Sequence, residues 1–194
     1  MIQKLSLLAI ASLLALSGNA AELPYADSFT GETQESRRLT RGPWIVKDGT
    51  ATCTQDDALY KKFKDHGPVI WYDLNFTDST VSYSMKADEA VKNFVFTING
   101  GEGHVFRFVS SPARTFVKAF PREGEPDGIL DRKAPPLKAD EWIDVSVTFN
   151  GESAIVKIGD YETTVTHPAI AQKKTTIGLG FSFGTMSFKD VAVK

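Results

Sequence analysis

The sequence predicts an all-β protein, a jelly-roll sandwich of two antiparallel sheets. Short runs in which apolar and polar residues alternate recur along the chain, and glycine, asparagine and aspartate separate them. Thirteen phenylalanines are enough to fill the layer between two sheets stacked about 10 Å apart. These observations together indicate roughly twelve to fourteen short strands that fold as one sandwich.

The first twenty residues predict a secretory signal rather than part of the fold. An early cation, Lys4, precedes the apolar run Leu5–Leu16, and small residues, Gly18 and Ala20, follow it. This run of twelve residues is shorter than the ~20 that a membrane-spanning helix needs. We therefore expect cleavage after Ala20, a periplasmic or extracellular location and no membrane insertion of the mature chain.

Composition restricts the class of partner and the sources of stability. The net charge is −2 and no basic stripe is present, which argues against nucleic acid as a partner. A single cysteine, Cys53, excludes an internal disulfide, and nothing nearby would activate its thiol, so we expect it to be buried and inert. After the signal, residues 21–41 are expected to lead into one sandwich domain over residues 42–194.

Individual strands follow from turn chemistry and from period-two patterns. Asp48-Gly49 lies between two strand-like runs and predicts a two-residue hairpin. Residues 94–98 and 105–109 predict a central hairpin, because both runs are apolar on both faces. Residues 56–64 fit either one or two turns of helix or a short strand, since Asp56 is a good helix cap.

Residues 121–140 form the one long segment without a strand pattern. Four prolines and two glycines prevent a regular ladder there. Such a loop is either a binding element or a mobile decoration, and the sequence leaves both open. Carboxylates at Glu125, Asp127 and Asp131 surround a glycine turn, so calcium is the one metal left open; we otherwise predict no cofactor.

Several segments resemble the 3-keto-disaccharide hydrolase domain family. Residues 42–49 resemble its W-x-V-x-D-G opening, residues 139–142 its G-E-W strand start, and residues 187–194 its terminal F-R-N-V-R-V strand. Residues 65–70, 102–107 and 166–170 are similar to a secreted, planctomycete-type branch of that family. The resemblance implies a concanavalin A-like jelly roll with glycoside hydrolase-like activity. Two mid-chain family segments have no clear counterpart here, which favours a non-catalytic module as the alternative.

Three residues are candidates for acid–base or electrostatic chemistry. His66 and His104 lie where turns meet strands, and imidazole can move a proton near neutral pH. Arg107 interrupts an apolar strand, where a guanidinium is costly to bury unless it is paired. We expect a pair between Arg107 and Asp73, either as a structural contact or as the polar floor of a sugar site. The competing interpretation of the histidines is that they bind backbone carbonyls in turns.

A second group of residues has the composition of a sugar-binding site. Trp71, Asp73 and Asn75 alternate with buried positions and so share one face of a strand. An indole ring beside directional polar groups suits a pyranose, although an ordinary core tryptophan is the competing interpretation.

These observations lead to an exported domain that acts on, or binds, an oligo- or polysaccharide. A ketone at the sugar's C3 acidifies the neighbouring C–H, so His104 or His66 could act as the base and Arg107 could stabilise the enolate. Whether the domain is an enzyme stays open. One alternative is a lectin-like module that binds glycans through Trp71, and another is an envelope protein-interaction domain.

Overall fold

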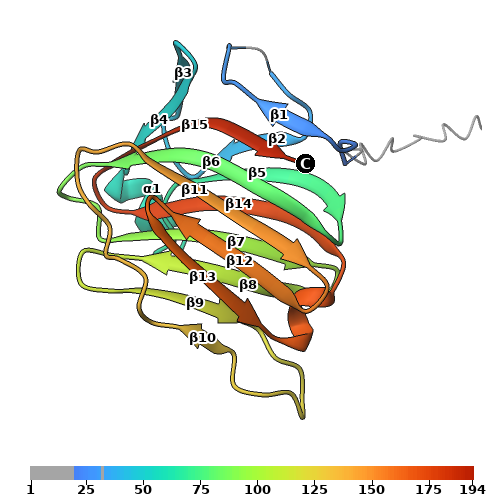
Figure 1. Ribbon diagram of the computed structural model, residues 1–194. Coiled ribbons are helices and arrows are strands. Elements are labelled where there is room, and N and C mark those ends of the chain that lie inside the picture. Colours follow the sequence, from blue (N-terminus) through green and yellow to red (C-terminus); the bar gives the residue numbers. More distant parts are fainter. Residues whose placement is uncertain (1–19, 32) are drawn as a thin grey trace, which may run out of the picture.

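The computed structural model describes residues 20–31 and 33–194, so the predicted signal sequence lies outside the described residues except for Ala20. Figure 1 shows a sandwich of two layers, with β11 to β13 lying across β7 to β9. All pairings between the named strands are antiparallel. The predicted all-β jelly roll with two antiparallel sheets is confirmed.

One sheet has eight strands, in the order β13-β12-β11-β6-β15-β4-β3, with β1 beside β15. Its strands are β1 Tyr25–Asp27, β3 Ile45–Lys47, β4 Thr50–Thr54, β6 Ser79–Ala87, β11 Ile143–Asn150, β12 Ser153–Ile158, β13 Tyr161–Thr166 and β15 Thr185–Val193. The other has seven, in the order β10-β9-β8-β7-β14-β5-β2. Its strands are β2 Arg37–Thr40, β5 Val69–Phe76, β7 Asn93–Gly100, β8 Gly103–Ser110, β9 Thr115–Ala119, β10 Ile129–Asp131 and β14 Lys174–Ser182.

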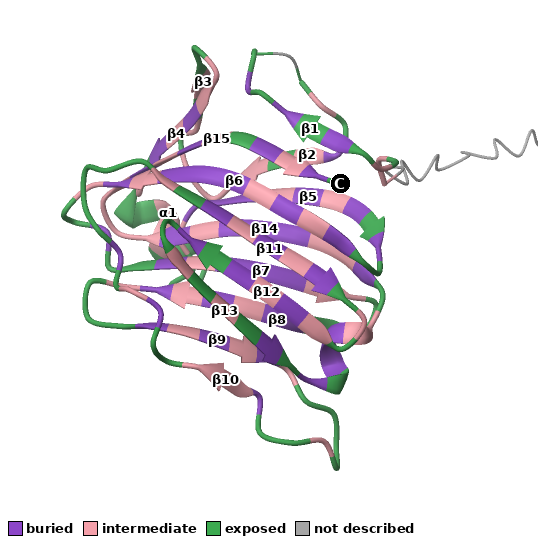
Figure 2. Ribbon diagram, viewed as in Figure 1, coloured by how far each residue is buried: buried purple, intermediate pink, exposed green. Residues whose placement is uncertain are grey.

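The layer between the sheets is built from the alternating residues that the sequence pattern predicts. Figure 2 shows buried and more exposed positions alternating along the central strands. Nine phenylalanines are buried in this layer: Phe29, Phe76, Phe94, Phe96, Phe106, Phe108, Phe149, Phe181 and Phe188. Cys53 is buried at its edge, and burial raises the pKa of its thiol to about 12. The thiol of Cys53 is therefore buried and inert, as expected.

Turn residues fix the hairpins. Asp48 and Gly49 have φ values of 51° and 75°, the conformation that a two-residue hairpin with two left-handed positions requires. Between β11 and β12, Asn150 pairs with Ser153, and Gly151 occupies the first turn position with φ 54°. Both turns match the strand twist, so they set the register of the strands that follow.

The ambiguous segment after β4 forms the helix α1, Asp57–Lys62. The carboxylate of Asp56 accepts a hydrogen bond from the backbone N–H of Leu59 at 2.8 Å, which satisfies an otherwise unpaired donor of the first turn. No residue of this helix is buried. The helix is therefore stabilised by its N-terminal cap and not by the burial of an apolar face. Among the described residues, no helix is long and apolar enough to cross a membrane.

The long loop over residues 121–140 joins the edges of the two sheets. Its strand β10 pairs with β9, while Asp131 at the end of β10 accepts hydrogen bonds from Tyr161 and Thr163 of β13. Burial tends to raise the pKa of Asp131, but these bonds and those from the backbone N–H groups of Lys133 and Ala134 lower it overall. Because Asp131 holds β13 while β10 pairs with β9, the segment acts as a brace between the sheets. Among the described residues, no group of three or more metal-ligating side chains lies together.

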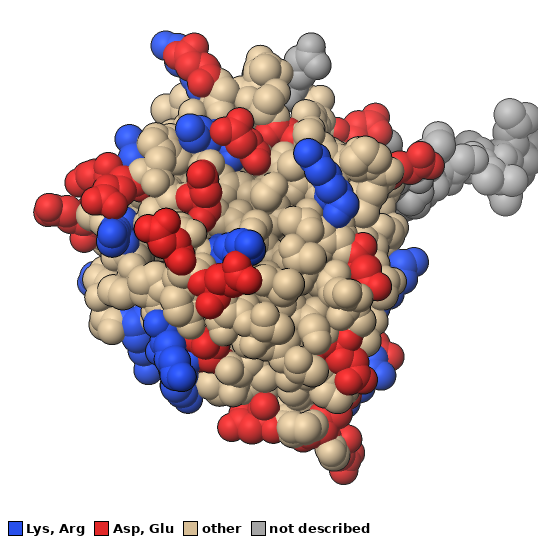
Figure 3. Space-filling view, viewed as in Figure 1, with Lys and Arg blue, Asp and Glu red and all other residues tan. Residues whose placement is uncertain are grey.

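An ion pair ties the N-terminal strands to the core. Arg37 Nη1 lies 2.8 Å and 2.9 Å from the two carboxylate oxygens of Asp27, and both side chains are almost fully buried. The hydroxyl of Tyr72 on β5 donates to the same carboxylate at 3.1 Å. Since β1 pairs with the eight-stranded sheet and β2 with the seven-stranded sheet, this cluster connects the two layers. On the face in Figure 3, by contrast, Lys and Arg are interspersed with Asp and Glu.

Replacing Asp27 with asparagine should lower the free energy of unfolding by about 3–5 kcal/mol, because the buried guanidinium of Arg37 would lose the carboxylate that lies 2.8 Å from it. Urea denaturation followed by fluorescence measures this change. The matched control is Asp48→Asn, which removes a carboxylate from the exposed Lys47–Asp48 pair and should change stability by less than about 0.5 kcal/mol. Equal effects of the two substitutions would contradict the role given to Asp27.

Candidate functional site

A groove of about 560 Å³ runs over the outer face of the seven-stranded sheet. Its floor comes from β5, β14, β7 and β8, which lie side by side in that order. Tyr60 of α1, with Asp65 and His66 of the loop that follows, also lines it. The groove therefore combines a rigid sheet with one loop.

The strand register brings residues from distant parts of the sequence into one row across this floor. The row, from β2 to β9, is Arg38, Trp71, Gly178, Thr97, Arg107 and Lys118. Neighbours in such a row lie on the same face, with Cβ atoms about 5 Å apart. Trp71 and Arg107, both predicted as site residues, therefore occupy a single row.

A glycine makes room for the indole ring of Trp71. A Cβ atom added to Gly178 would lie 2.5 Å from Cζ3 of Trp71 and 2.9 Å from Cε3, so the six-membered ring of the indole lies directly over the glycine. Gly180, two residues further along the same face of β14, also lines the groove. Trp71 is half-buried rather than in the core, which excludes the interpretation of an ordinary core tryptophan. The result is a shallow aromatic platform in the middle of the sheet.

His104, Arg107 and Asn99 form a hydrogen-bonded chain in the groove. Nη2 of Arg107 lies 2.7 Å from Nε2 of His104, and Nδ1 of His104 lies 2.7 Å from Oδ1 of Asn99. A guanidinium can only donate, so Nε2 of His104 must accept. Nδ1 then carries the proton and donates to the amide oxygen of Asn99. This network requires the neutral imidazole.

The electrostatics agree with that assignment. Partial burial lowers the pKa of His104 below its ordinary value of 6.5, and the positive charges of Arg107 and Lys118 lower it further. Burial also lowers the pKa of Arg107. The imidazole is therefore neutral at neutral pH, and Nε2 is free to accept a proton from a ligand once Arg107 turns to another acceptor.

Phe120 supports this cationic cluster from its apolar side. The ring centroid of Phe120 lies 5.0 Å from the ring of His104, 5.2 Å from the guanidinium carbon of Arg107 and 4.7 Å from Nζ of Lys118. Each cation is within the range of a cation–π interaction. Phe120 therefore holds three basic side chains close together at one side of the groove.

His66 also lines the groove, from the loop that follows α1, and hydrogen bonds to backbone carbonyls fix the orientation of its ring. Its Nδ1 is within 3.1 Å of the carbonyl oxygen of Phe63 and 2.8 Å of that of Lys64. Carbonyls accept, so Nδ1 carries the proton and Nε2 is left for other partners. His66 therefore fits the competing interpretation of a turn histidine, and it also lines the groove.

The expected pair between Arg107 and Asp73 is wrong. Asp73 instead accepts from Arg38, with Nε to Oδ2 at 2.7 Å and Nη2 to Oδ1 at 2.8 Å. The reason is the strand order: β7 and β14 separate β8 from β5, so the two backbones are about 14 Å apart, three strand spacings. Asp73 and Asn75 share the outer face with Trp71, as predicted, but neither lines the groove.

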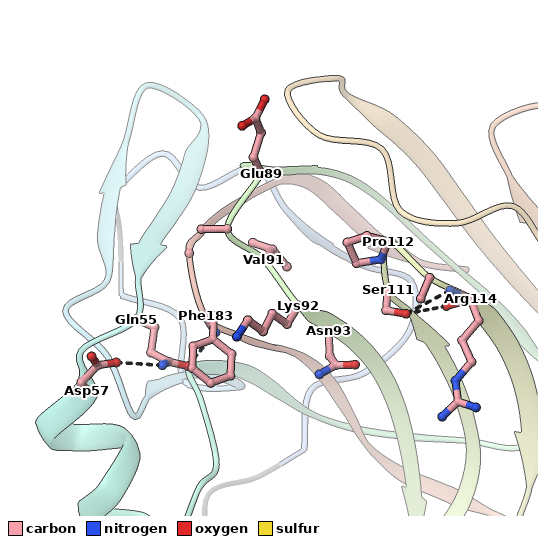
Figure 4. A pocket seen from close by; sticks show the side chains of 13 residues that line it. Gln55, Asp57, Glu89, Val91, Lys92, Asn93, Ser111, Pro112, Arg114 and Phe183 are labelled. Carbon is pink, nitrogen blue, oxygen red and sulfur yellow. Dashed lines mark hydrogen bonds between the residues drawn. The ribbon is translucent and has the colours of Figure 1, made fainter.

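A second hollow, of about 700 Å³, adjoins the groove at the end of the sheet and is drawn in Figure 4. Asn93, at the start of β7, lines both. Phe183 contributes an aromatic ring there from a left-handed backbone conformation, φ 65°, and Nζ of Lys92 lies 4.5 Å from the centre of that ring. An elongated ligand could therefore extend from the groove into this hollow.

Sequence reasoning missed four residues of the cluster: Thr97, Asn99, Lys118 and Phe120. Each looks like an ordinary strand or loop residue when the sequence is taken alone. Phe120, for example, follows the last residue of β9 and is separated from His104 by most of β8 and all of β9. Only the pairing of β8 with β7 and β9 brings these side chains to Arg107. One feature of the sequence does indicate the shape of the groove floor. Gly178 and Gly180 alternate with large apolar residues, so that face of the strand carries no side chains at these two positions.

Comparisons with solved structures agree with this architecture. Carbohydrate binding module CBM66 from Bacillus subtilis matches with a TM-score of 0.59, over 91% of this chain and 99% of its own, at 8% identity. A Bacillus licheniformis beta-glucanase gives 0.65, over 88% and 96%, at 10% identity. The CBM2 module of an evolved Dit protein of Lactobacillus casei BL23 phage J-1 gives 0.62, over 87% and 93%, at 12% identity. No protein-family model and no curated protein sequence matches the chain. These likenesses show a shared concanavalin A-like jelly-roll fold.

Proposed function

We propose that this protein is an exported carbohydrate-binding domain that holds an oligosaccharide in the groove of the seven-stranded sheet. The observation that carries this proposal is the indole of Trp71 lying over Gly178, beside hydrogen-bonding groups in the same row. The apolar C–H face of a pyranose stacks on such a ring, while its hydroxyl groups need directional polar partners. Thr97 and Arg107, which both line the groove, supply these partners.

The comparisons support a sugar over another small ligand. Two of the proteins with this fold are named carbohydrate-binding modules, and a third is a beta-glucanase. Export is part of the proposal because the first twenty residues have the charge, apolar run and small residues of a signal sequence.

A second candidate function is cleavage of a 3-keto glycoside. The specific observation that favours it is the neutral imidazole of His104, hydrogen-bonded to Arg107 in the groove. In this reaction the guanidinium of Arg107 turns from Nε2 of His104 to the ketone oxygen, which frees Nε2 to take the proton from the carbon beside the ketone. The electron pair moves to the ketone oxygen, where Arg107 stabilises the enolate. When the carbonyl re-forms, the C1–O bond breaks, the glycosidic oxygen leaves with the proton that the His104 imidazolium returns, and a double bond remains in the ring.

Trp71→Ala should weaken binding of the preferred oligosaccharide about tenfold or more, because it removes the stacking platform. A glycan array on the mature chain identifies the ligand, and isothermal titration calorimetry then measures the two affinities. Trp142→Ala is the matched control. Trp142 is 40% exposed and lies immediately before β11, a strand of the eight-stranded sheet and so not of the sheet that carries the groove. If both substitutions weaken binding equally, or neither does, the groove is not the binding site.

Turnover of a 3-keto glucoside, if the domain is catalytic, should depend on pH through His104. The neutral imidazole is the active base, so kcat/KM should be constant at neutral pH and fall as the pH decreases through the pKa of His104, which lies below 6.5. Asn99, Arg107 and Lys118 are the polar and charged groups that face this imidazole.

The control for this profile uses glutamine, which keeps polarity but does not titrate there. His104→Gln should abolish turnover, whereas His66→Gln should keep the acidic limb of the profile. If the wild-type chain binds a glycan tightly but turns over no 3-keto glucoside, the catalytic function is contradicted and the binding function stands. An acidic limb that survives in His104→Gln would assign the base to another residue.

A further inference from the structure

Three cations face the groove without a carboxylate partner. Arg41 and Arg107 line it, and Lys118 lies directly opposite Arg107 on the neighbouring strand. In the part of the chain that the structure describes, none of the three takes part in an ion pair. Asp65 is the single acidic residue among those lining the groove. The groove is therefore positive, whereas the chain as a whole has a net charge of −2.

This arrangement is unfavourable for the free protein. Like charges directly opposite each other on paired strands destabilise a sheet, and Arg107 is half-buried as well. The hydrogen-bond partners of Arg107 are the hydroxyl of Thr97, at 3.2 Å, and the neutral imidazole of His104. Neither carries a negative charge, and the ring of Phe120 adds only a cation–π contact, so the half-buried guanidinium has hydrogen bonds but no counter-ion.

Nearby arginines show that carboxylate partners are available in this sheet. Arg38, in the same row as Arg107, is held by Asp73 at 2.7 Å. Arg122, just after β9, is 2.7 Å from Glu102. A carboxylate partner for Arg107 and Lys118 would likewise stabilise the folded chain. The unpaired charges point instead to an anionic group that arrives with a ligand.

We propose that the saccharide bound in this groove is acidic, with a carboxylate or sulfate group held between Arg107 and Lys118. This inference rests on the proposed function, because it names the class of sugar for the same groove. A guanidinium binds a planar oxyanion through two parallel hydrogen bonds, and an ammonium adds a point charge. The free protein keeps Arg107 oriented toward the groove through Thr97 and His104, so the ligand meets an ordered donor.

The strand spacing fixes where the acidic group lies relative to the stacked sugar. The ring of Trp71 leans over β14, and β8 is two strands further on, about 10 Å away. The acidic group therefore belongs to the stacked unit or to the unit next to it. An oligosaccharide of at least two units is the ligand that reaches both contacts.

Two matched ligand pairs test the proposal by isothermal titration calorimetry on the mature chain. The first is an oligogalacturonate and its fully methyl-esterified form, which keeps the sugar chain but loses the charge. The second is a sulfated chondroitin oligosaccharide and its desulfated form. We expect the loss of charge in the preferred pair to weaken binding roughly 10- to 100-fold, which is the range for charge-assisted hydrogen bonds. Preference for one pair identifies the anion as carboxylate or sulfate.

Variants connect the charge preference to the groove. Arg107→Gln and Lys118→Gln should each reduce the difference in affinity between the charged and uncharged ligand at least severalfold, and Lys118→Gln should leave affinity for the uncharged ligand within about twofold. Lys157→Gln is the control, because it removes one positive charge from the opposite sheet, where Lys157 pairs with Glu162. It should leave the difference unchanged. Thermal denaturation of each variant confirms that it is folded, and Lys118→Gln tests the proposal if Arg107→Gln is unstable.

The outcomes separate this inference from the function on which it rests. Equal affinity for charged and uncharged ligands, with binding still lost in Trp71→Ala, would overturn the acidic-saccharide proposal and keep the carbohydrate-binding function. Binding of neither kind of saccharide would overturn both. A charge preference that persists in both Arg107→Gln and Lys118→Gln would place the anion elsewhere and overturn the proposed site.

Discussion

The packing of aromatic side chains between the two sheets is the interaction on which the rest of this structure depends. With a single cysteine, the chain has no internal disulfide, so burial of apolar surface must hold the layers together. Phe94 contacts the rings of Tyr83, Phe108 and Phe188, which come from both sheets, at centroid distances near 6 Å. Such contacts make the core rigid, and truncation of a ring of this kind typically costs about 3–5 kcal/mol.

That rigid core makes the outer face of the seven-stranded sheet available for function. Because the inward residues of β5, β14, β7 and β8 carry the stability, the outward ones are free to be small, charged or aromatic. Gly178 illustrates this freedom: its outward position has no side chain, and the ring of Trp71 occupies the space. A larger residue there would preserve the sheet but remove the platform.

Electrostatics distinguish the groove from the other charged parts of the molecule. The Asp27–Arg37 pair is buried and satisfied, and it connects the two sheets. Arg107 is also partly buried, yet its partners are neutral. A fold optimised for stability alone would pair both arginines in the same way. The difference between them is the reason to assign Asp27–Arg37 to structure and Arg107 to a ligand.

The sequence by itself determined the fold class, the inward and outward faces of most strands and the hairpin turns. These features depend on local rules: a period of two, and turn residues that tolerate left-handed backbone conformations. It also placed Trp71, Asp73 and Asn75 on one face of a strand, and His66 and His104 next to turns. Their alternation and position could be seen without any knowledge of strand order.

Only the tertiary structure decided which of these residues meet. The predicted partner of Arg107, Asp73, is three strands away and pairs with Arg38, while His104, Asn99, Lys118 and Phe120 surround Arg107 instead. The long loop over residues 121–140 is a brace between sheet edges, a role that depends on where β13 ends up. The physical reason is the same in each case. Strand order is set by long-range packing of the whole core, and one sequence pattern is compatible with many strand orders.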